Sequence, residues 1–152
     1  YSSSIHPIRH DHYGVPDAPR FPFAPAAGRD LAEIPVGTVD LRGRRLSCAG
    51  GGFFRLLPYR WSSHAIGRVN RTEGQPVTFY FHPWEIDPGQ PRIGPAPLRS
   101  RLRHYTNLSV MESKLKRLLS DFRWDRIDHV YRAALSGKHH HGGEGGSASI
   151  SA

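Results

Sequence analysis

Prolines decide which parts of this chain can form helices. A proline inside a helix removes one hydrogen bond and clashes with the preceding turn, and it biases the residue before it toward extended backbone. Nine of the 13 prolines fall within residues 1–30 and 88–97, at Pro7, Pro16, Pro19, Pro22, Pro25, Pro88, Pro91, Pro95 and Pro97. We therefore expect a long loop in the first segment and a linker or wrapping arm in the second, with the regular elements between and after them.

The region between the two proline clusters has the pattern of a βαβ unit. β-Branched residues favour a strand over residues 34–41, with Gly43 at a turn. Apolar residues recur at helical spacing over residues 57–70, where Pro58 suits the first turn. Residues 77–82 are short, apolar and aromatic, which is typical of a strand buried on both faces of a parallel sheet. This order of elements predicts an α/β protein.

Three consecutive glycines, residues 50–52, precede the expected helix. Glycine tolerates positive φ and lets another group approach the backbone closely. No Gly-Lys-Ser/Thr sequence follows at the spacing of a phosphate-binding loop, so that function is excluded.

The C-terminal third predicts one amphipathic helix and a tail. Ser109 and Glu112 match a capping box at the start of that helix. Its apolar face consists of Leu108, Met111, Leu115, Leu118, Leu119 and Phe122. A second, short helix is expected over residues 127–135, and residues 136–152 have the composition of a disordered tail.

The charge balance does not by itself indicate a partner. The net charge is +8, and 18 of the 21 cationic residues are arginine. The arginines are spread along the chain, the densest patches are short, and no helix-turn-helix, zinc-finger or RNP-like motif is present. We interpret the excess of arginine as a compositional bias and expect no nucleic-acid partner, although an acidic or phosphorylated polysaccharide would suit such a surface. No run of 18 apolar residues exists, so no membrane span is expected.

His82 is the sharpest candidate for chemistry, because it ends the apolar segment 77–82 and a histidine can exchange a proton near neutral pH. Glu85 and Asp87 are close enough in sequence to orient it, whereas a hydrogen-bonded histidine at a strand end is the structural alternative. Tyr80 and Trp84 are candidates for contacts with substrate, and Trp84 could equally cap the core.

Other polar groups are weaker candidates. The single cysteine, Cys48, excludes an intramolecular disulfide and a cysteine-based zinc site, and we expect a buried or bystander thiol. Asp125 and His129 have the spacing of a surface pair on a helix. Two groups of potential metal ligands lie in irregular sequence where we expect no metal site: His6, His10, Asp11 and His12, and His139, His140 and His141.

Five motifs in order carry a resemblance to a known family. They are Arg9-His10-Asp11-x-Tyr13-Gly14-x-Pro16-Asp17-Ala18-Pro19-Arg20, Glu33-Ile34-Pro35-Val36, Gly50-Gly51-Gly52-Phe53-Phe54-Arg55-Leu56-Leu57-Pro58-Tyr59, Phe79-Tyr80-Phe81-His82-Pro83-Trp84-Glu85-Ile86-Asp87-Pro88 and Arg103-His104-Tyr105-Thr106-Asn107-Leu108. Together they resemble the C-terminal half of a polysaccharide deacetylase, of the NodB-homology type that accompanies exosortase and exopolysaccharide genes.

The resemblance implies a metal-dependent amidohydrolase on a distorted (β/α) barrel. In such enzymes an Asp–His–His set holds a divalent metal, usually zinc, and a second Asp activates the attacking water. His82 matches the histidine that protonates the departing sugar amine. The motifs that supply the metal ligands and the base belong upstream of residue 1, so we expect no metal on this chain alone. Its opening at Tyr1, with the sole methionine at Met111, fits a piece of a longer protein.

The sequence thus predicts a fragment of a polysaccharide deacetylase that is inactive alone and needs the missing N-terminal half of the barrel. We expect barrel remnant over residues 1–94, a family-specific helical extension over 95–135 and the tail over 136–152. Two other functions stay open: a non-catalytic carbohydrate-binding or assembly module, and a basic nucleic-acid-binding protein. The compartment is not encoded here, and we favour a bacterial, cytoplasmic location.

Overall fold

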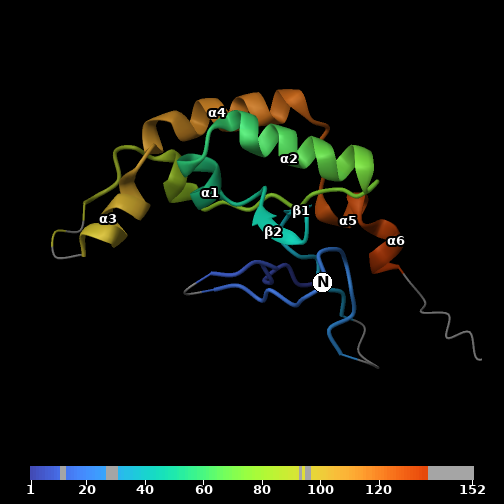
Figure 1. Ribbon diagram of the computed structural model, residues 1–152. Helices are drawn as coiled ribbons and strands as arrows, with labels where there is room; N and C mark the ends of the chain where they lie inside the picture. The colour runs from blue at the N-terminus through green and yellow to red at the C-terminus, as the bar shows by residue number, and fades with distance from the viewer. Residues whose placement is uncertain (11–12, 27–30, 93, 95–96, 137–152) are drawn as a thin grey trace, which may run out of the picture.

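The computed structural model describes residues 1–10, 13–26, 31–92, 94 and 97–136, which form a mixed α/β structure (Figure 1). Its elements in chain order are β1 (Thr38–Leu41), β2 (Arg44–Ser47), α1 (Gly51–Leu56), α2 (Tyr59–Thr72), the 3-10 helix η1 (Pro83–Ile86), α3 (Leu98–Tyr105), α4 (Leu108–Asp121), α5 (Ile127–Val130) and α6 (Arg132–Leu135).

Strands β1 and β2 form an antiparallel hairpin in which Thr38 pairs with Ser47 and Leu41 with Arg44. The two residues of its turn both have positive φ, 56° at Arg42 and 80° at Gly43. This is the turn whose twist matches that of the strands. The turn expected at Gly43 is confirmed, but the strand covers only the second half of the predicted range 34–41.

Two isolated bridges among the described residues pair segments of the chain in parallel orientation. Ser2 pairs with Glu33 and Val36 with Thr78, each in parallel orientation. Because α2 lies between residues 36 and 78 in the sequence, the second bridge closes the expected strand–helix–strand connection. The segment 77–82 is nevertheless extended rather than part of a regular ladder.

Within the described ranges, the only regular strands are therefore those of the hairpin, and no barrel closes. A strand buried on both faces needs neighbours along its ladder. The 77–82 segment has backbone donors from one side, Gly37 N to Thr78 O at 3.0 Å and Gly51 N to Tyr80 O at 2.7 Å. Its apolar pattern correctly indicated extended, partly buried backbone but overstated the sheet around it.

The helices follow the apolar spacing with local differences. Helix α2 confirms the one expected over 57–70, and α4 confirms the amphipathic helix. The capping box at Ser109 is wrong, since α4 begins at Leu108 after Asn107, which has a φ of 59°. The short helix expected over 127–135 is interrupted at Tyr131, while α1 and α3 were not predicted.

The hydrophobic core lies between the hairpin, α1, α2 and α4, and Figure 1 shows α2 and α4 side by side over the hairpin. Its buried members are Val39, Cys48, Phe54, Ala65, Ile66, Val69, Met111 and Leu118. Met111 and Leu118 bring α4 into this core. Burial raises the pKa of the Cys48 thiol to about 12, so it stays protonated and behaves as the buried bystander expected.

The proline-rich N-terminal arm packs onto the rest of the protein. Arg20 forms an ion pair with Glu73 at 2.6 Å and donates to the carbonyl of Thr38, and Phe21 packs against the core. The described helices include none long and apolar enough to cross a membrane. The boundary expected at residue 94 stays a prediction. Of the expected tail, residues 136–152, only Ser136 lies within the described residues, directly after α6.

Candidate active site

His82 lies where the extended segment ends and η1 begins. Its backbone N–H donates to Glu85 Oε2 at 2.9 Å, which fixes the chain at this point. Its imidazole is exposed, and His82 Nε2 shares a hydrogen bond with the hydroxyl of Tyr80. The two rings meet edge to face with centroids 4.9 Å apart. The imidazole of His82 therefore faces solvent, while the hydrogen bond to Glu85 fixes the backbone that carries it.

The group that holds this backbone is a buried ion pair. Arg55 Nε donates to Glu85 Oε1 at 3.1 Å, and the two side chains are only 2% and 3% exposed. The other nitrogens of Arg55 donate to three carbonyls at the end of α3, those of Arg103, His104 and Thr106. The planar guanidinium thus satisfies both the carboxylate and the unpaired carbonyls of a helix C-terminus.

Gly51 leaves the space that Glu85 occupies. A Cβ at Gly51 would lie 1.9 Å from Glu85 Oε2, closer than any two such atoms can approach. The close approach expected from the three glycines is confirmed at this residue, and Gly50 supplies the positive φ, 105°.

Trp84 is part of the packing beside His82. Its ring stacks on that of His104 with centroids 4.1 Å apart, and the guanidinium of Arg55 lies 5.3 Å from its centre. The ring of His82 is parallel to it at 5.7 Å. These contacts hold Trp84 in a cluster with His82, His104 and Arg55, and its two expected roles, contact with substrate or a cap, stay predictions, as does contact with substrate for the exposed Tyr80.

The two expected carboxylates differ in position. Glu85 is buried and contacts the backbone of His82, whereas Asp87 is exposed and accepts the N–H of Gly89 at 2.9 Å. Of the pair, Glu85 is the one placed to orient His82, and it does so through the main chain rather than the imidazole.

A second aromatic cluster borders this site. The ring of Tyr13 stacks on His10 at 3.9 Å and on His6 at 6.0 Å, and Phe53 meets both histidines edge to face. Burial, then the charge of His10, lowers the pKa of His6 to about 4. His6 Nε2 is buried without a hydrogen-bond partner in the described structure.

The two clusters are close enough to act on each other electrostatically. Burial raises the pKa of the Tyr13 hydroxyl, the charge of Arg103 opposes this, and that of Glu85 adds to it. Tyr13 in turn helps to raise the pKa of Tyr80, after burial and Glu85. Sequence reasoning gave no role to Tyr13, Arg55 or His104, although all three stand in the motifs quoted above.

Among the described residues, no group of three or more His, Cys, Asp or Glu side chains is placed to hold a metal. Asp11, His12 and the three histidines 139–141 lie outside the described residues. His129 Nδ1 lies 3.3 Å from Asp125 Oδ2 and both side chains are exposed, as expected of a surface pair.

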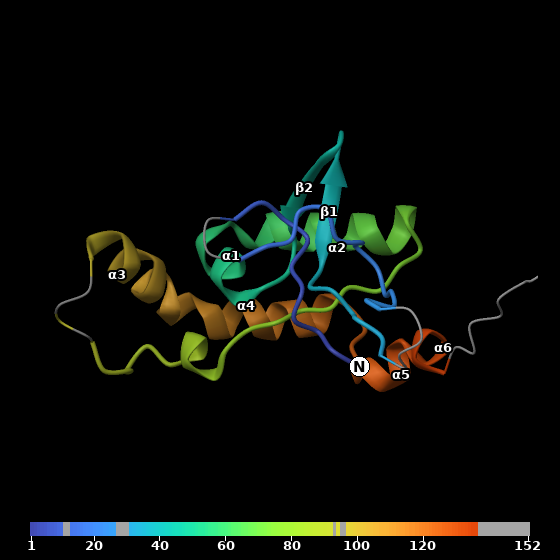
Figure 2. The ribbon, with the colours of Figure 1, turned by 90° about the horizontal axis from the view of Figure 1, so that it is seen from below.

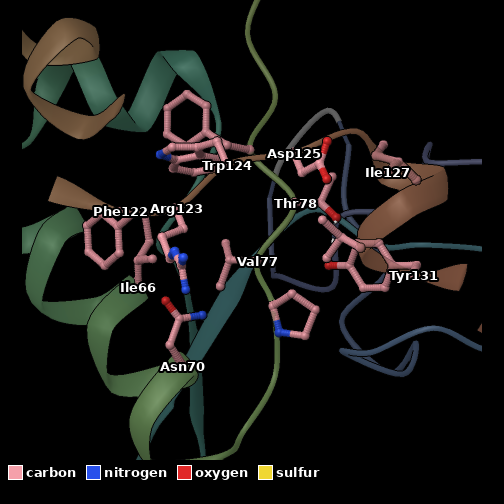
Figure 3. Close-up of a pocket in the computed structure, with 13 residues that line it drawn as sticks. Ile66, Asn70, Val77, Thr78, Phe122, Arg123, Trp124, Asp125, Ile127 and Tyr131 are labelled. Atoms are coloured by element: carbon pink, nitrogen blue, oxygen red, sulfur yellow. Dashed lines mark hydrogen bonds between the residues drawn. The ribbon is translucent and has the colours of Figure 1, made fainter. Parts of the chain in front are cut away.

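A cavity of about 160 Å³ lies elsewhere, between α2, the start of the extended segment and the chain after α4 (Figure 3). Apolar side chains such as Ile66, Val77 and Trp124 line it, and the hydroxyls of Thr78 and Tyr131 are hydrogen-bonded at 3.0 Å. Of the candidates for chemistry, its lining includes Asp125 but none of His82, Tyr80, Trp84, Glu85 and Asp87.

Comparison with protein families gives one match. Residues 3–132 match the family described as "Domain of unknown function (DUF3473)". The chain belongs to this family. No curated protein and no solved structure matches this chain significantly. Because the match runs from the N-terminal arm to the start of α6, the site around His82 lies inside the extent of the DUF3473 domain.

Proposed function

We propose that this chain is the C-terminal part of a polysaccharide deacetylase, which hydrolyses N-acetyl groups on a polysaccharide. The observation that carries the proposal is the placement of His82. It is exposed at the C-terminal end of a segment that pairs in parallel with residue 36, and in parallel α/β folds chemistry is concentrated at such ends. The family resemblance in the sequence assigns the same residue the role of proton donor.

The surrounding residues support this role. Arg55 neutralises Glu85, and Glu85 holds the main chain of His82, so the imidazole is presented on a fixed backbone. In the proposal, Tyr80 keeps the imidazole oriented until the departing amine replaces its hydroxyl as the partner of Nε2. His82 then transfers a proton to that amine as the C–N bond breaks.

The proposal requires more than the described residues. The parallel bridges would be remnants of a (β/α) barrel whose other strands come from an upstream segment. Because the described residues lack a ligand set for zinc, the metal ligands and the base would also come from that segment. The isolated 152-residue chain is accordingly expected to be inactive.

Acetate release tests the proposal. The substrate is a chitooligosaccharide, and the comparison is between the isolated chain and the same chain preceded by its upstream coding sequence, each with added zinc. We expect release only from the longer protein. Zinc-dependent turnover by the isolated chain would contradict the account of the missing half. Saturable glycan binding by the longer protein without any acetate release would instead indicate a non-catalytic carbohydrate-binding module.

A further inference from the structure

Helix α3 exposes apolar side chains that nothing in the described structure covers. Leu98 is 70% exposed and Leu102 is 57% exposed, and none of the eight residues of α3 is buried. The two leucines are four residues apart, so they lie on one face of the helix. Figures 1 and 2 show α3 at one end of the molecule, away from the hairpin.

The segment that carries α3 is strongly basic. Residues 88–111 contain four arginines and no aspartate or glutamate. Three of these arginines, Arg99, Arg101 and Arg103, are exposed on α3 itself. The leucines are thus flanked by positive charge without a neighbouring carboxylate in the sequence to neutralise it.

The attachment of α3 orients its leucines outward. The ring of His104 stacks on Trp84, and Arg55 binds the carbonyls at the C-terminal end of the helix. Two residues along a helix correspond to about 200° of rotation, so Leu102 lies on nearly the opposite side from His104. His104 therefore holds α3 from the side opposite Leu102, while Tyr105, on the leucine side, donates to the carbonyl of Pro91 at 3.4 Å and lies 5.5 Å from the guanidinium of Arg92.

We propose that α3 binds the anionic surface of a membrane. Leu98 and Leu102 would enter the boundary between headgroups and acyl chains, and Arg99 and Arg101 would contact the lipid phosphates and carboxylates. A polysaccharide or a nucleic acid could neutralise the arginines but offers the two leucines no apolar phase. An anionic bilayer accommodates both features, and the proposal does not depend on the deacetylase activity.

Co-sedimentation with vesicles tests the proposal, using the longer protein in which the upstream coding sequence precedes this chain. We expect binding to phosphatidylcholine vesicles that contain about one-quarter phosphatidylserine, weak binding to pure phosphatidylcholine, and weakening by added salt. The double variant Arg99→Gln/Arg101→Gln should lower the partition coefficient roughly tenfold or more. The double variant Leu98→Ser/Leu102→Ser should also lower it, at unchanged net charge.

A charge-matched control comes from the hairpin turn. Arg42 and Arg44 are exposed, and Arg42→Gln/Arg44→Gln removes the same charge without touching α3. It should reduce binding much less than the α3 variants, and circular dichroism should show all variants folded like the parent chain. Equal losses from both arginine pairs, or binding that ignores the leucine change, would overturn the proposal in favour of a general polyanion surface. So would leucine-dependent self-association without vesicle binding, which would make α3 a protein interface.

Discussion

Arg55 has the most demanding environment of any charged residue around the site. Its guanidinium is removed from water and is compensated by one carboxylate and three carbonyls. Removing a single partner from such a pair leaves the other charge buried without compensation, which is far more costly than losing an exposed pair. The stability of the chain around His82 should therefore depend on Arg55.

The variant Arg55→Met should lower the free energy of unfolding by about 3–5 kcal/mol, because Glu85 and the α3 carbonyls lose their donors. Urea denaturation measures the change. The control is Lys116→Met, which breaks an exposed pair with Glu112 and should leave the urea midpoint nearly unchanged. Similar losses in the two variants would show that the Arg55–Glu85 pair is not the main attachment of this region.

The lowered pKa of His6 predicts how the free energy of unfolding depends on pH. In the unfolded chain its imidazole takes up a proton near pH 6.5, but in the folded chain only near pH 4. The unfolded state therefore binds more protons between these values, so stability falls as the pH falls from about 6.5 to 4. The loss attributable to His6 amounts to at most about 3 kcal/mol.

Thermal unfolding at pH 7 and pH 4.5 measures this effect. His6→Gln should reduce the difference in Tm between the two conditions, because glutamine does not titrate. The matched control is His64→Gln on the exposed face of α2, which should leave the difference unchanged. A pH dependence identical in the parent chain and in His6→Gln would contradict the assignment.

At the scale of elements, α1 depends on a glycine at one position and not at the next. Gly51→Ala should destabilise the fold by about 2 kcal/mol or more, because its Cβ would collide with the Glu85 carboxylate. Nothing lies within 4 Å of a Cβ at Gly52, so Gly52→Ala should be neutral or slightly stabilising in the same helix. Thermal unfolding of the two variants should separate them, and equal Tm values would contradict the packing described.

The elements that the sequence predicted best are those with sustained apolar spacing. Helices α2 and α4 each continue for 14 residues without an internal proline, so the helical period is visible in both. Helix α1 was missed because two glycines begin it and it is only six residues long, and α3 was missed because arginines dominate it and none of its residues is buried. Carbonyls at their C-terminal ends accept hydrogen bonds from residues distant in the sequence, from Lys114 at α1 and from Arg55 at α3.

The candidate site was predictable only as a list of residues from one short segment. His82, Tyr80 and Glu85 do lie together, as their spacing suggested. The partners that come from other segments, such as Arg55 and Tyr13, could not be found by spacing, because their proximity depends on tertiary packing. The same limit explains why the sequence pattern predicted too much sheet around residues 77–82, because the sequence of one strand does not specify which segments pair with it.

At the scale of the whole molecule, the proposed enzyme would add strands to the parallel bridges that the described residues form, Ser2 with Glu33 and Val36 with Thr78. Backbone without partners at a sheet edge lowers stability and favours association. In the proposed enzyme, the described chain contributes the proton donor, and the upstream segment contributes the nucleophilic half of the reaction.

The most direct test of this account is the His82→Ala variant of the longer protein, assayed for acetate release and for bound zinc in parallel. We expect turnover to fall about 10²–10⁴-fold, the range typical of a lost general acid, with zinc content unchanged. His64→Ala, on the exposed face of α2, serves as the control and should keep full turnover. Turnover unaffected by His82→Ala would contradict the proposed role, and loss of zinc would make His82 a metal ligand instead of the proton donor.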